Sequence, residues 1–237
     1  MGKNNYFQFK QFTIHQEKAA MKVGTDGTLL GAWASINNYT RILDVGTGTG
    51  LIALMMAQRS KATITAIEIE KNAALEAKHN VANSLWGNRV DVQHISLQQY
   101  ARNCTNTFDL IVSNPPFFSQ AFKAANENRT MARHNDSLPF SELFSISAEL
   151  LNPKGKLALV LPIDATNDCE KLADENKLSL IRKTEVKPNS RKVANRVLLE
   201  FSKKKAAPVF DCLTIYKENG DYTDSYKFQT KEFYLKF

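Results

Sequence analysis

The stretch Asp44-Val45-Gly46-Thr47-Gly48-Thr49-Gly50 decides the fold of this chain. It follows a short apolar run, residues 41–45, and leads into residues 51–59, which suit a helix. A strand, a glycine turn and a helix in this order cradle nucleotide-like ligands in open α/β sheets. The glycine spacing is G-x-G-x-G, whereas dinucleotide-binding proteins use G-x-G-x-x-G. A carboxylate just before the first glycine would repel a pyrophosphate and suits an amino-bearing ligand instead.

Apolar and amphipathic segments alternate downstream of this turn. Strands are predicted at residues 41–45, 62–67, 89–95, 108–113, 156–161, 180–186 and 196–201, and helices at 51–59, 71–83, from 97, 140–151 and 165–176. This alternation predicts an α/β fold with a doubly wound, mostly parallel sheet of seven strands and helices on both faces. Only a loop, 187–195, separates the last two strands, so the last strand should be antiparallel.

Segments outside this core are predicted less regularly. Residues 6–14 alternate aromatic and polar side chains, which indicates a strand or hairpin. Asp26 precedes an apolar segment and is a candidate N-cap for a helix over residues 28–34. Residues 118–137 lack apolar periodicity and suit a long functional loop. Residues 211–216 form a further possible strand.

Length and composition indicate one globular domain. The 237 residues are 43% hydrophobic and 23% charged, which is ordinary for a soluble protein. We expect a covering segment (1–36), a catalytic core (37–202) and a C-terminal extension (203–237). The three cysteines are distant from one another and form no C-x-x-C pair, which favours reduced thiols in the cytoplasm. No apolar run suits a membrane span or a signal peptide, so we expect no membrane association.

Two further strand ends carry polar groups. Glu68 ends the second strand, 24 residues after Asp44, where a carboxylate can accept hydrogen bonds from both ribose hydroxyls. A solvated charge is the alternative interpretation. Asn114-Pro115-Pro116-Phe117 ends the fourth strand. The prolines stop the strand and hold Asn114 in extended geometry.

This Asn-Pro-Pro-Phe stretch suits a planar amino group. The Asn114 amide oxygen and the Pro115 carbonyl can both accept from one exocyclic NH₂, and Phe117 offers a face for stacking an unpaired base. Together, Asp44-x-Gly-x-Gly-x-Gly, Glu68 and Asn114-Pro-Pro-Phe117 resemble the class I S-adenosylmethionine-dependent methyltransferases, which have a Rossmann-like fold.

A closer resemblance extends from residue 7 to about residue 201. Phe9-Lys10-Gln11-Phe12, Lys22-Val23-Gly24-Thr25-Asp26-Gly27, Leu29-Leu30-Gly31-Ala32-Trp33 and Arg133-His134 all look like the bacterial tRNA adenine-N6 methyltransferases. Those enzymes act on adenine 37 of a valine tRNA, beside the anticodon. The resemblance therefore implies methyl transfer from S-adenosylmethionine to N6 of this adenine.

The resemblance also implies a role for each matching residue. Gly46, Gly48 and Gly50 would approach the methionine part of the cofactor, with Asp44 near its amino group, Glu68 on the ribose, and Lys22, Gly24 and Thr25 closing over the cofactor. Asn114, Pro115, Pro116 and Phe117 would hold the target adenine. Ser96 stands where these enzymes often carry an aspartate that contacts the cofactor adenine, and its hydroxyl would bond the adenine amino group without a charge. Orientation and proximity supply most of the catalysis, and the mechanism needs no metal.

The positive charge of the chain favours an anionic partner. The formal net charge is +7. Nine Lys/Arg lie between residues 182 and 205, against only two acidic residues. A solvated edge is the ordinary interpretation of such a run. With a tRNA anticodon loop implied as substrate, we expect phosphate contacts from Lys187, Arg191, Lys192 and Arg196. Arg133 and His134 are further candidates for tRNA contact or for support of the cofactor pocket.

Two other functions remain open from the sequence. A protein glutamine N5-methyltransferase would also use an Asn-Pro-Pro-aromatic stretch, because a glutamine amide is planar and bears an NH₂ group. A non-catalytic RNA-binding module could keep the same fold. The basic surplus disfavours the first, and the intact glycine turn, Glu68 and Asn114 disfavour the second. Nothing in the sequence requires an obligate protein partner.

Overall fold

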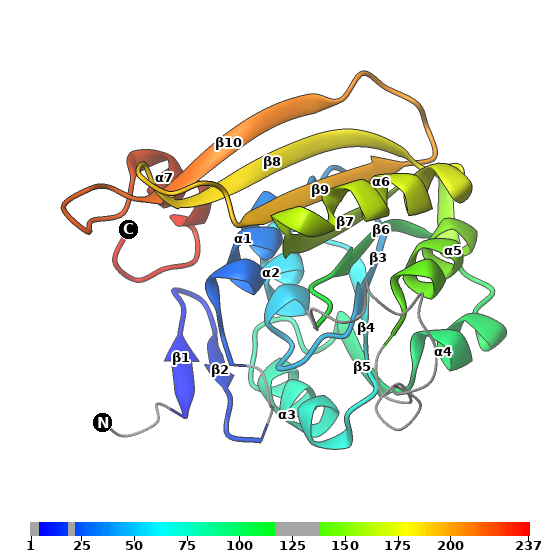
Figure 1. The fold of residues 1–237 in the computed structure, drawn as a ribbon. Coiled ribbons are helices and arrows are strands. Elements are labelled where there is room, and N and C mark those ends of the chain that lie inside the picture. Colours follow the sequence, from blue (N-terminus) through cyan, green and yellow to red (C-terminus); the bar gives the residue numbers. More distant parts are fainter. Residues whose placement is uncertain (1–4, 19–21, 117–137) are drawn as a thin grey trace, which may run out of the picture.

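The structure, a computed structural model, describes residues 5–18, 22–116 and 138–237 (Figure 1). Its strands are β1 (Tyr6–Gln8), β2 (Thr13–His15), β3 (Arg41–Val45), β4 (Thr63–Glu68), β5 (Val90–His94), β6 (Phe108–Ser113), β7 (Leu151–Pro162), β8 (Ser179–Asn189), β9 (Arg196–Ser202) and β10 (Val209–Tyr216). Its helices are α1 (Thr25–Trp33), α2 (Leu51–Arg59), α3 (Lys71–Ala82), α4 (Leu97–Asn103), α5 (Phe140–Leu150), α6 (Thr166–Glu175) and α7 (Asp224–Thr230), with a short 3-10 turn at Ile163–Ala165.

The main sheet has the order β10-β8-β9-β7-β6-β3-β4-β5. All neighbours are parallel except the two pairs that β9 makes, with β7 and with β8. The predicted parallel sheet with an antiparallel last core strand is therefore confirmed. The sheet has one strand more than the seven predicted, because β10 pairs in parallel with β8 at the edge. Strand order reverses between β3 and β6, where ligands bind in open α/β sheets.

Helices cover both faces of this sheet (Figure 1). Side chains from α1, α2 and α3 pack with alternate strand residues such as Ile42 on one face. Side chains from α4, α5 and α6 pack with the intervening residues such as Leu43 on the other. Because the central parallel strands are buried on both faces, they appear in the sequence as continuous apolar runs.

Three local predictions need correction. Helix α1 begins at Thr25 and is capped by Gly24 without a side-chain hydrogen bond, so Asp26 lies in its first turn and is not the N-cap. Strand β7 begins at Leu151 rather than at residue 156, with a shift in its register against β6. Strand β8 extends to Asn189, into the segment predicted as loop.

Residues 6–14, predicted as a strand or hairpin, belong to a hairpin. Strands β1 and β2 form a separate antiparallel pair in which Phe7 lies opposite Ile14. The backbone N–H of Lys10 donates to the carbonyl of Phe233, so the hairpin also contacts the C-terminal tail. Among the described residues, no helix combines the length and the apolar character that crossing a membrane requires.

Candidate active site

A cavity of about 510 Å³ lies at the carboxyl ends of β6, β3, β4 and β5. Seven of the predicted site residues contribute to its wall: Gly46, Gly48, Glu68, Ser96, Asn114, Pro115 and Pro116. They come from four different strand ends, and parallel topology is what brings these ends to one edge of the sheet. The fold therefore brings these residues, which are far apart in the sequence, together around one cavity.

The glycine turn leaves open space on the cavity side. Gly46 and Gly48 have φ angles of +70° and +56°, in the left-handed region that favours glycine, and an added Cβ at either would meet nothing within 4 Å. Gly50 does a different job. Its added Cβ would lie 3.5 Å from the Cα of Ala77, so this residue lets α2 start close to α3, and it is absent from the cavity wall.

Asp44 supports the turn from behind. Its side chain is fully buried, and its Oδ2 accepts hydrogen bonds from the Thr47 hydroxyl at 2.6 Å and from the Ala53 N–H at 3.0 Å. Burial raises the pKa of the Asp44 carboxyl to about 7, and the neighbouring Glu68 charge acts in the same direction. Its Oδ1 is buried and has no hydrogen-bond partner among the described residues. The predicted contact with an amino group would give this oxygen a partner, and that contact stays a prediction.

Glu68 joins the glycine turn to the start of α3. Its Oε2 accepts from the Gly48 N–H at 2.8 Å, and its Oε1 accepts from the Glu70 N–H at 2.9 Å. The side chain is 8% exposed and faces the cavity. Each carboxylate oxygen has a second lone pair, so both oxygens can still accept from ligand hydroxyls. A ribose-binding role therefore fits the geometry.

Asn114, at the end of β6, is the predicted hydrogen-bond acceptor for a substrate amino group. Its Oδ1 is buried without a hydrogen-bond partner among the described residues, which is an expensive state for an amide oxygen. Gly27 of α1 lies alongside, since an added Cβ there would come within 3.8 Å of Asn114 Nδ2 and 3.3 Å of Leu51 Cδ2. The hydroxyl of Ser113 donates to the Val45 carbonyl at 2.8 Å, which ties β6 to β3 directly beneath Asn114.

Ser96 lies at the β5 end of the cavity and caps α4. Its Oγ accepts from the Gln99 N–H at 3.2 Å. Three polar side chains of α4, which the sequence prediction did not include, also line the cavity: Gln98, Gln99 and Arg102. Their only signal in the sequence is that they follow Ser96 by two to six residues.

The N-terminal segment approaches the site without forming its wall. Lys22, Gly24 and Thr25 are absent from the cavity lining, and Lys22 is solvent-exposed. Gly24 caps α1, and its carbonyl accepts from both the N–H and the hydroxyl of Thr28. Their predicted closure over a cofactor stays a prediction.

Asn80 of α3 is a structural residue of the site that the sequence did not indicate. Its Oδ1 accepts from the His15 N–H, and its Nδ2 donates to the carbonyls of His15 and Thr49, all at 2.9 Å. Asn80 is 1% exposed and so connects the N-terminal hairpin with the glycine turn. These are bonds to backbone groups, which leave no trace in the spacing of motifs.

Comparisons with known proteins identify the family. A model of the methyltransferase small domain matches residues 27–177. A tRNA1(Val) (adenine(37)-N6)-methyltransferase of Trichodesmium erythraeum is 46% identical over 98% of this chain and 99% of its own length. The protein of the same name from Parabacteroides distasonis is also 46% identical, with the same coverage.

This chain belongs to the tRNA1(Val) (adenine(37)-N6)-methyltransferase family. The family resemblance drawn from the motifs is thereby confirmed. Among solved structures, a predicted O-methyltransferase from Agrobacterium tumefaciens matches with a TM-score of 0.70 at 17% identity, covering 88% of this chain and 96% of that one. That likeness concerns the methyltransferase fold alone.

Membership in this family implies S-adenosylmethionine as methyl donor, and the site residues fit it. The open space beside Gly46 and Gly48 admits a ligand close to the backbone. The buried Oδ1 atoms of Asp44 and Asn114 accept no hydrogen bond from any described residue, so each can accept one from a ligand. Within the described ranges, no cluster of three or more His, Cys, Asp or Glu is arranged to hold a metal ion.

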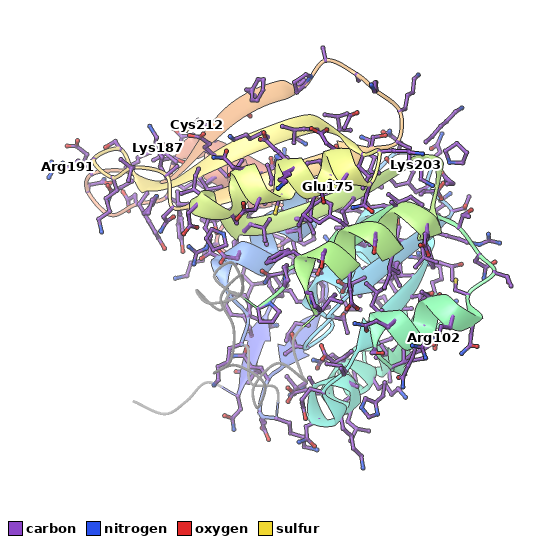
Figure 2. The ribbon with its side chains drawn as sticks, turned by 45° about the vertical axis from the view of Figure 1, so that its right-hand side comes forward. Arg102, Glu175, Lys187, Arg191, Lys203 and Cys212 are labelled. Carbon is purple, nitrogen blue, oxygen red and sulfur yellow. The ribbon has the colours of Figure 1, made fainter. Side chains whose placement is uncertain are left out.

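Four of the six predicted tRNA-binding residues lie at the end of β8, the start of β9 or the turn between them: Lys187, Arg191, Lys192 and Arg196. Figure 2 shows Lys187 and Arg191 together there, well separated from Arg102 on α4. Arg191 pairs with Glu218 at 2.9 Å, and Arg196 pairs with Asp26 at 2.9 Å. Lys187 and Lys192 make no ion pair with any described residue. Phe117, Arg133 and His134 lie outside the described residues.

Proposed function

We propose that this chain methylates N6 of adenine 37 in a valine tRNA, with S-adenosylmethionine as the methyl donor. Family membership supports the reaction, because the curated relatives carry that activity in their names. The observation that carries the proposal at the site is the buried, unpartnered Oδ1 of Asn114, beside the glycine turn. An exocyclic amino group is the donor that this oxygen lacks.

The strand order supports an arrangement of the reactants along the sheet edge. Asn114 lies at the end of β6, the glycine turn follows β3, Glu68 ends β4 and Ser96 follows β5. Neighbouring strands are about 4.8 Å apart, so the four ends span roughly 14 Å. We assign the target adenine to the β6 end, the methionine part to β3, the ribose to β4 and the cofactor adenine to β5.

The protein acts by binding and orientation in this mechanism. S-adenosylmethionine supplies a methyl group activated by its positively charged sulfur. The Asn114 amide oxygen and the Pro115 carbonyl accept hydrogen bonds from the adenine N6 amino group, which orients it and favours lone-pair density on the nitrogen. Glu68 fixes the ribose, and Asp44 holds the glycine turn in place. Holding the reacting atoms together supplies most of the rate.

We further propose the cytoplasm as the place of this activity, with the tRNA anticodon loop as partner. All three cysteines are free thiols, Cys169 buried and Cys212 exposed. The division into a covering segment (1–36), a core (37–202) and an extension (203–237) also remains our proposal.

Labelled methyl transfer to tRNA from cells lacking this modification tests the proposed function. We expect N6-methyladenosine in a single valine tRNA. The Asn114→Ala variant should lose activity on the order of 100-fold, because the amino group is no longer oriented. The same variant should retain its affinity for S-adenosylhomocysteine, measured by calorimetry. Methylated protein alongside unmethylated RNA would favour the glutamine methyltransferase, and tRNA binding without any transfer would favour the binding module.

A further inference from the structure

The β5 end of the cavity carries more polar groups than the proposed function has used. Ser96, Gln98, Gln99 and Arg102 all line it, beside the apolar side chains of Ile69 and Ile95. Apolar side chains flanked by hydrogen-bonding groups are what a nucleobase requires, since its faces are apolar and its edge is polar.

Two of these groups are already engaged. The Ser96 hydroxyl oxygen accepts from the Gln99 N–H at 3.2 Å and thereby caps α4. The Gln98 Nε2 donates to the Glu142 carboxylate at 2.6 Å, which fixes its amide against α5. Neither side chain can reorient toward the polar edge of a base without breaking its present hydrogen bond.

Gln99 is different. Its side-chain amide lines the cavity, is solvent-exposed and makes no hydrogen bond with any described residue. Its backbone is held on both sides, because its N–H donates to Ser96 Oγ and its carbonyl accepts from Asn103 Nδ2 at 3.5 Å. The position of the residue is therefore fixed while the amide remains available.

We propose that Gln99 is the residue that recognises the adenine of the methyl donor. This inference rests on the proposed function, which assigns that adenine to the β5 end. A glutamine amide offers an acceptor and a donor side by side, and adenine presents the N6 amino donor beside ring-nitrogen acceptors. One amide can satisfy both. Arg102 has only donors and cannot accept from the amino group.

This assignment explains how the site works without an aspartate at position 96. The acceptor for the adenine amino group moves from the strand end to the first turn of α4. Ser96 then acts as a positioning residue that holds the backbone of Gln99 through its cap.

Calorimetric binding of two ligands tests the proposal. The first is S-adenosylhomocysteine, and the second is its deamino analogue, in which hydrogen replaces the 6-amino group of the purine. Wild-type protein should prefer the first by roughly tenfold, the worth of one good hydrogen bond. In Gln99→Ala this preference should fall to about one, whereas Gln99→Glu, which keeps the acceptor, should retain it. Gln93→Ala, on β5 but outside the cavity wall, serves as the matched control and should behave as wild type.

The outcomes distinguish a failure of the role of Gln99 from a failure of the proposed methyl donor. Undiminished preference in Gln99→Ala, no preference in the wild type, or loss of preference in Ser96→Ala while Gln99→Ala keeps it would each overturn the role of Gln99. Failure of the wild type to bind S-adenosylhomocysteine at all would overturn the assignment of the methyl donor, and with it both proposals.

Discussion

At the scale of single residues, Asp44 combines burial with an incomplete set of hydrogen bonds. Burial raises the pKa of its carboxyl from the ordinary 3.8 of an aspartate to about 7, although the Thr47 and Ala53 hydrogen bonds oppose this shift. The folded protein therefore holds a proton on Asp44 between these two pH values, where the unfolded chain releases it. Stability must fall as pH rises across that window and then level off above about pH 7.

The Asp44→Asn variant makes this effect measurable. Relative to this neutral isostere, the wild type should lose about 3 kcal/mol of unfolding free energy between pH 5 and pH 8. Denaturant unfolding at a series of pH values gives the difference curve. With saturating S-adenosylhomocysteine the loss should shrink, because a cationic amino group near Asp44 favours its ionised form. Parallel curves for the two proteins at every pH would contradict the raised pKa.

At the scale of elements, α3 holds the N-terminal hairpin and the glycine turn together. Asn80 contributes three hydrogen bonds to this junction, and Glu76 accepts from the backbone N–H groups of Glu17 and Lys18 at 2.6 and 2.9 Å. These contacts hold residues 15–18 against α3.

Removing the Asn80 amide should therefore affect both stability and ligand binding. Asn80→Ala leaves three backbone groups without their partner, and we expect a loss of about 2–4 kcal/mol in unfolding free energy. Affinity for S-adenosylhomocysteine should fall as well, because the Thr49 carbonyl of the glycine turn is released. Asn72→Ala, exposed on the same helix, is the control. If both variants unfold at the same denaturant concentration, the junction does not hold the hairpin.

Burial decides which strands and helices can be predicted from the sequence. The strands β3, β4 and β6 were predicted to within a residue or two, because buried parallel strands are continuous apolar runs ended by recognisable turns. Helix α7 was missed, since only Tyr226 and Thr230 are buried and no apolar period results. Cavity-lining residues that belong to recognisable motifs could be named from the sequence, whereas Asn80 could not, because its contacts depend on which segments meet in space.

At the scale of the whole molecule, positive charge lies at the same edge of the sheet as the cavity. β8 runs parallel to β3 and β6, so its carboxyl end, near Lys187, faces the same way as theirs. Phosphate contacts by Lys187 and Lys192 stay predictions. Arg191 and Arg196 already hold carboxylates, which makes them weaker candidates than the sequence implied.

Neutralising these lysines should weaken tRNA binding without affecting the cofactor. For Lys187→Ala/Lys192→Ala we expect the salt dependence of the tRNA association constant to become shallower by about 1.5–2 units of log–log slope. S-adenosylhomocysteine affinity should stay at its wild-type value. Lys61→Ala/Lys154→Ala, at the opposite edge of the sheet, is the charge-matched control. Equal slopes for the two double variants would remove this surface from the substrate-binding site.

The order of strand ends at the cavity separates the selection of the methyl acceptor from the selection of the methyl donor. Under the proposed function, the methyl acceptor is selected at β6 and the donor's base at β5, with β3 and β4 lying between them. Because β3 and β4 separate the two strand ends, the side chains that set each specificity can change independently. A synthetic donor with an altered base would therefore call for redesign at the start of α4 alone, and an enzyme–donor pair orthogonal to the cell's own methyl metabolism could keep its tRNA selectivity unchanged.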